Sequence, residues 1–158
     1  MTTVTYNMRI PNMLISCVND FQRQDELYAH ISSLEQEYPF FMDWYYNTVL
    51  PGTTIGLRKI IVATIEDNIA GVLILKDASE KKICTLRVES EYRGNGLGHR
   101  LMNIAIRELK TEYPLITVSD IHIDEFMTLF RDNKFRFSKM YFEKYIKGHY
   151  EIAFNGYL

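Results

Sequence analysis

The sequence predicts an α+β domain built on a mixed, mainly antiparallel sheet that is flanked by helices. Three observations predict this class: consecutive β-branched runs separated by turns, one long amphipathic helix after them, and a further strand and hairpin towards the C-terminus. With 158 residues and 47% hydrophobic content, the chain has the size of one domain with a buried core. We therefore expect residues 1–158 to form a single domain.

The N-terminal part of the chain predicts one strand and two helices. The strand lies in one of two apolar stretches, Val4–Ile10 or Met13–Val18, and the pattern does not decide between them. The first helix ends before Pro39, because the residue that precedes a proline avoids the helical region. The two helices and the loop after them are expected at Asp20–Leu34, Phe40–Val49 and Thr53–Gly56.

Three consecutive antiparallel strands are expected in the middle of the chain. Their residues are β-branched and apolar, and the Asp67-Asn68 pair between the first two tolerates the left-handed conformations of a two-residue hairpin turn. After the third strand an amphipathic helix begins near His99, with apolar side chains at helical spacing as far as Leu109. The strands are expected at Arg58–Glu66, Ile69–Lys76 and Ile83–Val88.

A second β-region follows the long helix. Leu115–Asp120 is predicted to be a strand, and because a helix joins it to the preceding strand, the two should lie parallel. A short helix over Asp124–Asp132 and a terminal hairpin complete the domain. The hairpin strands are expected at Phe135–Tyr145 and Tyr150–Phe154.

Composition argues against several classes of function. The formal net charge of −2 and the pI of about 6.1 argue against nucleic acid as a partner, since nucleic-acid binders usually carry a basic face. Cys17 and Cys84 have no paired spacing and no accompanying histidine cluster, which argues against a metal site and favours a reducing compartment. The N-terminus lacks a signal-like pattern and no stretch is apolar enough to span a membrane, so we expect a soluble, cytoplasmic protein without a membrane partner.

The most informative feature is the glycine-rich stretch Arg93-Gly94-Asn95-Gly96-Leu97-Gly98, which joins the third strand to the long helix. The first turn of a helix leaves backbone N–H groups unpaired and carries partial positive charge, so a phosphate can bind to main chain alone. Glycines have no Cβ to block its approach, and they accept the positive φ values that turn successive N–H groups towards one anion. The stretch therefore predicts a phosphate-binding loop.

The glycine spacing distinguishes between the known kinds of phosphate loop. Glycines at 94, 96 and 98 do not match the G-x-G-x-x-G register of a dinucleotide site. The last of them is followed by histidine and arginine, whereas the P-loop of nucleotide hydrolases needs lysine and then serine or threonine. Both of these classes are therefore disfavoured.

The pattern R-x-x-G-x-G, formed by Arg93, Gly96 and Gly98, resembles the pyrophosphate loop of the GNAT superfamily of acyl-CoA-dependent N-acetyltransferases. The similarity covers residues 55–137 and includes the Leu-x-Val of Leu86–Val88 before the loop. It implies a GNAT-like fold whose central parallel strands splay apart for CoA, with acetyl-CoA as co-substrate and no metal. The strand backbone would bond the pantetheine arm, and the loop N–H groups would bind the pyrophosphate. The implied cofactor-binding residues are Leu86, Val88, Arg93, Gly94, Asn95, Gly96, Leu97 and Gly98.

The activity that this resemblance implies is direct transfer of an acetyl group from acetyl-CoA to a primary amine, either a small molecule or a protein or peptide amino group. No covalent intermediate is expected in this family, so Cys84 need not be a nucleophile. The sequence departs from the family at two proton-transfer positions, where Phe130 replaces the usual tyrosine acid and Lys82 a glutamate base. His122, which titrates near neutrality, and Tyr141, in the terminal hairpin, are the catalytic candidates.

Other interpretations stay open. The missing tyrosine and glutamate are also consistent with an acetyl-CoA-binding sensor or regulatory module that has no turnover. Some members of the superfamily acetylate aminoacyl-tRNA, and the mild acidity of this chain argues against that activity. The aromatic segment Tyr38–Tyr46 is either core or one wall of the acceptor groove. The sequence does not name the acceptor, and a homodimeric assembly stays open.

Overall fold

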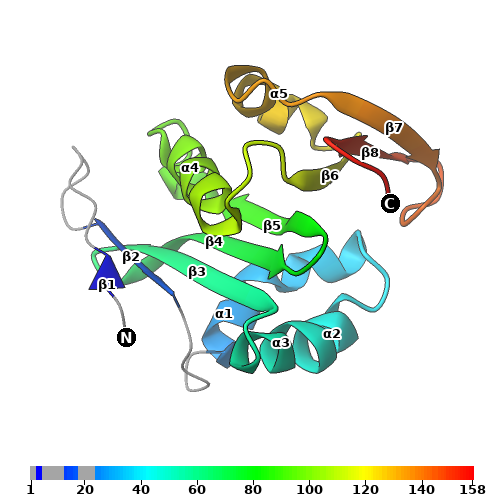
Figure 1. Ribbon diagram of the computed structural model, residues 1–158. Coiled ribbons are helices and arrows are strands. Elements are labelled where there is room, and N and C mark those ends of the chain that lie inside the picture. Colours follow the sequence, from blue (N-terminus) through cyan, green and yellow to red (C-terminus); the bar gives the residue numbers. More distant parts are fainter. Residues whose placement is uncertain (1–2, 5–12, 18–23) are drawn as a thin grey trace.

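The computed structural model describes residues 3–4, 13–17 and 24–158, and these form one eight-stranded sheet with helices on both faces (Figure 1). Within these residues the strand order is β1-β2-β3-β4-β5-β6-β8-β7, and every neighbouring pair is antiparallel except β5 and β6. The predicted α+β class with a mixed, mainly antiparallel sheet is therefore confirmed. The strands are β1 (Thr3–Val4), β2 (Met13–Cys17), β3 (Arg58–Ile65), β4 (Asn68–Asp77), β5 (Lys81–Val88), β6 (Leu115–Ser119), β7 (Phe137–Phe142) and β8 (Tyr150–Phe154).

The helices cover opposite faces of the sheet. α4 lies across β4 and β5 on one face, while α1, α2 and α3 cover the other, as Figure 1 shows. The helices and helical turns are α1 (Gln24–Ile31), the 3₁₀ turn η2 (Ser32–Gln36), α2 (Phe41–Trp44), the π-helical turn η3 (Tyr45–Val49), α3 (Leu50–Thr54), the 3₁₀ turn η4 (Ser90–Tyr92), α4 (Leu97–Leu109) and α5 (Ile123–Asp132).

Both faces of the central strands are buried, and each face belongs to its own core. Along β3, Ile61 and Ala63 pack in the core beneath α4, whereas the alternate residues Ile60 and Val62 pack against the N-terminal helices. Successive side chains of a strand point to opposite faces, so one run of apolar residues supplies both cores. This explains why β3 and β4 are almost continuously hydrophobic in sequence.

The N-terminal predictions are confirmed in part. Met13–Val18 supplies β2, whereas most of Val4–Ile10 and the predicted helix start at Asp20 lie outside the described residues. The prediction that the second helix closes before Pro51 is wrong, because helical structure continues through α3. Pro51 lies in the first turn of α3, where its missing N–H leaves no hydrogen bond unmade, and this shortens the predicted loop at Thr53–Gly56.

Two other predicted boundaries shift slightly. The β3–β4 turn is made by Glu66 and Asp67, both at positive φ, rather than by Asp67-Asn68, since Asn68 already pairs with β3. α4 begins directly after its N-cap Gly96, earlier than the predicted start near His99. Gly96 has a φ of 81°, so it ends the loop and leads the chain into the helix.

The C-terminal half extends the sheet through the predicted parallel pair. β6 runs parallel to β5, and the terminal hairpin of β7 and β8 joins the sheet through β8. The first hairpin strand is shorter than the predicted Phe135–Tyr145, because the chain turns at Glu143, which has a φ of 52°. Among the helices of the described ranges, none is long and apolar enough to cross a membrane.

Candidate functional site

A cavity of about 1160 Å³ lies where β5 and β6 separate. The two strands pair only at Lys82–Leu115 and Ile83–Ile116, although β5 continues to Val88. Beyond this pairing, residues of both strands line the cavity. The predicted splay of the central parallel pair is therefore confirmed.

A β-bulge at Cys84 marks the point of separation. Ile74 of β4 pairs with Thr85, and the next residue, Leu75, pairs with Ile83, so Cys84 is an extra residue without a partner on β4. A bulge bends its strand and increases the local twist, and this one directly follows the last residue that pairs with β6. The edge of β5 beyond the bulge suits main-chain hydrogen bonds to an extended ligand.

The glycine loop closes one end of the cavity. Gly94 and Gly96 have φ values of 80° and 81°, which place them in the left-handed region as the sequence predicts. A Cβ built on Gly94, Gly96 or Gly98 would meet no atom within 4 Å, so the space in front of the loop is open. N–H groups at a helix N-terminus beside such a space fit an anionic group such as a pyrophosphate.

All the predicted CoA-binding residues except Asn95 line the cavity. Arg93 also holds the loop in place: its Nε donates to the carbonyl oxygen of Val88 at 3.0 Å, and its Nη1 lies 3.6 Å from the Glu125 carboxylate. Leu97 is buried in the core beneath α4. The loop therefore presents mainly glycine main chain to the cavity.

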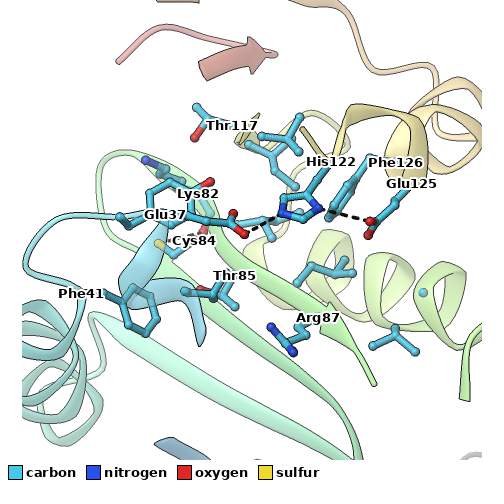
Figure 2. Close-up of a pocket in the computed structure, with 18 of the residues that line it drawn as sticks. Glu37, Phe41, Lys82, Cys84, Thr85, Arg87, Thr117, His122, Glu125 and Phe126 are labelled. Carbon is cyan, nitrogen blue, oxygen red and sulfur yellow. Dashed lines mark hydrogen bonds and ion pairs between the residues drawn. The ribbon is translucent and has the colours of Figure 1, made fainter. Parts of the chain in front are cut away.

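His122, the first catalytic candidate, lies in the cavity wall between two carboxylates. Figure 2 shows its ring between Glu37, which precedes α2, and Glu125 of α5. Its Nε2 is 2.7 Å from Oε1 of Glu37, and its Nδ1 is 3.2 Å from Oε1 of Glu125. The hydrogen bond to Glu37 is the main cause that raises the pKa of His122, Glu125 raises it further, and burial opposes both. The two carboxylates therefore stabilise the imidazolium form relative to a free imidazole.

The structure does not bring Tyr141, the second candidate, to the cavity. Its hydroxyl accepts a hydrogen bond from the main-chain N–H of Leu158 at 2.9 Å, on the edge strand β7. Phe130, at the position of the usual tyrosine, is 1% exposed and packs among other phenylalanine side chains in the core. Lys82, at the position of the usual glutamate, does line the cavity. Of the two catalytic candidates, His122 lines this cavity and Tyr141 does not.

Sequence reasoning missed a second polar group, around the carboxyl of Glu151 on β8. Glu151 is 3% exposed, and its Oε1 accepts a hydrogen bond from the Tyr38 hydroxyl at 3.2 Å. The Thr117 hydroxyl of β6 also hydrogen-bonds to this carboxyl, while burial, the largest effect, raises the pKa of Glu151. Tyr38 and Thr117 line the cavity. An acid within the apolar strand Tyr150–Phe154 was the signal in the sequence, whereas no pattern singles out Glu37.

The part of the cavity around Cys84 is aromatic and basic. The Arg58 guanidinium donates to Sγ of Cys84 at 3.1 Å and lies 5.8 Å from the ring centroid of Trp44. Burial, the largest effect, raises the pKa of the Cys84 thiol, and Arg58 opposes it. Phe41 packs in the N-terminal core and also lines the cavity, so the core interpretation is confirmed for this residue, and the acceptor-groove interpretation stays a prediction. Across the described ranges, no group of three or more His, Cys, Asp or Glu side chains is arranged to hold a metal ion.

Comparisons with known proteins agree with this geometry. Residues 47–125, half of the chain, match the family model of the acetyltransferase (GNAT) domain. No curated protein matches the sequence. Similar solved structures include Naa50 of Arabidopsis thaliana in complex with the bisubstrate analogue CoA-Ac-MVNAL, with a TM-score of 0.69 and 17% identity over 92% of this chain and 99% of that chain.

Two bacterial structures show the same similarity. An acetyltransferase of Bacillus subtilis in complex with CoA has a TM-score of 0.62 and 18% identity over 89% of this chain and 95% of that chain. An acetyltransferase of the GNAT family from Bacillus cereus has a TM-score of 0.67 and 14% identity over 90% of this chain and 94% of that chain. At these identities, the similarity establishes the fold.

Proposed function

The chain belongs to the GNAT acetyltransferases, and on this premise we propose that it transfers the acetyl group of acetyl-CoA to a primary amine by direct attack. The observation that carries the proposal is one cavity that extends from the glycine loop to the gap between β5 and β6. The loop N–H groups bind the pyrophosphate, and the β5 edge beyond the bulge holds the extended pantetheine arm. The thioester then lies at the gap, beside Thr85 and Thr117.

Main-chain N–H groups of β5 stabilise the charge that develops during the attack. Negative charge builds on the thioester carbonyl oxygen, and a preorganised donor at this point is worth roughly 3–4 kcal/mol. Cys84 takes no part as a nucleophile, because burial raises its pKa and keeps the thiol neutral near pH 7. The acetyl group therefore passes directly to the amine.

His122 is the proton donor to the departing thiolate. Its raised pKa favours the protonated ring, and the hydrogen bond of Nε2 to Glu37 at 2.7 Å holds the ring in one orientation. The longer contact of Nδ1 to Glu125, at 3.2 Å, opens so that this N–H reaches the sulfur. General acid catalysis of this kind contributes about 10²–10⁴-fold to the rate. His122 thus takes the role for which the sequence lacks the usual tyrosine.

The acceptor is a small amine or a peptide amino group that carries an apolar part. Tyr38, Phe41 and Trp44 line the cavity, and aromatic rings offer flat apolar surface to such a group. We expect an amine with an aromatic or branched side chain to be acetylated faster than methylamine, because only the larger amine contacts these rings.

Release of free CoA from acetyl-CoA, measured against a panel of small amines and peptides, tests the proposal. We expect acetylation of at least one acceptor, and acetyl-CoA should raise the melting temperature because it binds only the folded chain. A thermal shift without CoA release for any acceptor of the panel would identify an acetyl-CoA sensor instead. Absence of both the shift and the turnover would refute the CoA site.

A further inference from the structure

The proposed reaction leaves the attacking amine without a proton acceptor. A primary amine is mostly an ammonium ion at neutral pH, and its nitrogen attacks only after a proton has left. The neighbours of His122 raise its pKa and so favour its protonated form, and Lys82 stands where the family resemblance implies a glutamate. The base must therefore come from another part of the cavity wall.

We propose that Glu151, acting through the hydroxyl groups of Tyr38 and Thr117, accepts the proton of the attacking amine. This inference rests on the proposed function. The Tyr38 hydroxyl donates to Oε1 of Glu151 at 3.2 Å, and the Thr117 hydroxyl bonds to the same carboxyl. Both hydroxyl-bearing side chains line the cavity, while Glu151 is 3% exposed. A proton thus reaches Glu151 through the hydroxyls rather than directly.

The relay lies at the gap where the thioester is expected. Thr117 directly follows Ile116, the last β6 residue that pairs with β5, and Figure 2 shows it above Cys84 and Thr85 of β5. Glu151 lies on β8, the other neighbour of β6. The Tyr38 ring packs edge-on against Tyr145, with ring centroids 5.1 Å apart, which holds its hydroxyl towards Glu151.

The direction of the hydrogen bonds suits proton uptake. A carboxylate only accepts, so each hydroxyl that donates to it keeps its oxygen lone pairs for a donor in the cavity. In the first step the ammonium proton passes to the Tyr38 oxygen while the Tyr38 hydroxyl proton passes to Glu151. The free amine then attacks, the C–N bond forms, the C–S bond breaks and the thiolate takes the proton of His122. The second proton of the nitrogen restores His122, and Glu151 returns one proton to solvent.

The surroundings of Glu151 raise the pKa of its carboxyl, which suits a proton acceptor. Burial is the main cause that raises the pKa of its carboxyl, which makes it a stronger base than an exposed carboxylate. Glu37 adds to this effect, whereas Lys82 and the two hydroxyls oppose it. The groups that face the carboxyl are Glu37 and Tyr38 before α2, Lys82 of β5, Thr117 of β6 and Tyr145 before β8. Turnover is therefore expected to fall as the pH drops and Glu151 becomes protonated.

The test is kcat against pH at saturating acetyl-CoA and acceptor. Glu151→Gln keeps the shape of the side chain, and we expect it to lower kcat about 10²-fold and to remove the acid limb of the profile. Tyr38→Phe should lower kcat less, since the Thr117 hydroxyl still connects the cavity to Glu151. The exposed controls Glu112→Gln and Tyr157→Phe should change neither quantity. The acetyl-CoA thermal shift should persist in all four variants.

Each outcome of these measurements either supports or overturns the relay to Glu151. A Glu151→Gln protein that keeps the acid limb overturns it even if kcat falls, because altered packing alone lowers kcat without changing the pH profile. If this variant does not fold, the double variant Tyr38→Phe with Thr117→Val removes both hydroxyls, and an unchanged profile then overturns the relay. An unaltered protein without turnover overturns the proposed function and the relay together. If all variants keep the turnover of the unaltered protein, the relay is overturned and the proposed function still stands.

Discussion

The two ends of the cavity are built in different ways. The proposed CoA pyrophosphate end is one continuous stretch, Arg93–Gly98, and it presents mainly main chain. The proposed proton-transfer end takes its side chains from segments that are far apart in sequence: Glu37, Tyr38, Thr117, His122 and Glu151. Main-chain binding depends on local backbone conformation, which glycine spacing encodes, whereas proton transfer depends on distances between side chains that only the folded sheet sets.

This difference also separates the two ends in their response to pH. In the proposed site the loop binds through N–H groups that do not titrate, while His122 and Glu151 carry raised pKa values. We therefore expect turnover to vary with pH much more than acetyl-CoA affinity does.

Gly96→Asp should abolish the acetyl-CoA thermal shift. It adds bulk and negative charge in the open space before the loop, at a φ of 81°. At a ligand concentration of 100 Kd, about 2.7 kcal/mol of stabilisation would be lost. Gly148→Asp, at a φ of 78° in the turn before β8, is the matched control with the same backbone strain outside the cavity. An unchanged shift in the first variant would contradict the loop assignment.

His122→Gln should lower kcat about 10²-fold and change the alkaline side of the pH profile. Because His122 donates only when protonated, turnover of the unaltered protein should fall as the pH rises through its pKa, which lies above the ordinary 6.5. The variant should lack this fall, while acetyl-CoA binding stays intact. His149→Gln, which removes a histidine paired with Asp120 outside the cavity, is the control. Persistence of the alkaline fall in His122→Gln would assign it to another group.

Gly71→Ala should destabilise the scaffold that both ends share. A Cβ on Gly71 of β4 would lie 2.9 Å from Cδ1 of Leu101 on α4 and 3.2 Å from the carbonyl oxygen of Arg87, and the backbone oxygen yields little. We expect a loss of about 1–3 kcal/mol in the free energy of unfolding, measured by urea denaturation. Gly98→Ala, in the first turn of α4 and without close contacts, should not lower it. Equal free energies of unfolding of the two variants would contradict the close packing of α4 on β4 at Gly71.

Cys84→Ser should have the smallest effect. Direct transfer needs no thiol, so turnover should stay close to that of the unaltered protein, and no acetylated protein should be seen by mass spectrometry during the reaction. Loss of turnover together with an acetyl adduct on Cys84 in the unaltered protein would replace direct attack by a covalent route.

Much of the fold could be predicted because its signals are local. The central strands, α4 and the parallel strand after it follow from apolar periodicity and from the length of the connection. The predicted end of the second helix at Pro51 was wrong because proline also fits the first turn of a helix. The predicted β3–β4 turn was one residue late because Asn68 pairs with β3, which leaves Glu66 and Asp67 to make the turn. The site divides in the same way: glycine spacing indicated the loop, but no local pattern joined Glu37 to His122.

The strand pattern, the glycine loop and the family to which they belong can all be inferred from the sequence. These features depend on neighbours a few residues apart, where spacing and backbone preference act directly. The folded chain was needed to show that Phe130 lies in the core, that Tyr141 lies on an edge strand and that Tyr38 contacts Glu151. The reason is that β8 pairs with β6 and the segment before α2 packs beside them, which brings residues 38 and 151 together despite their distance along the chain.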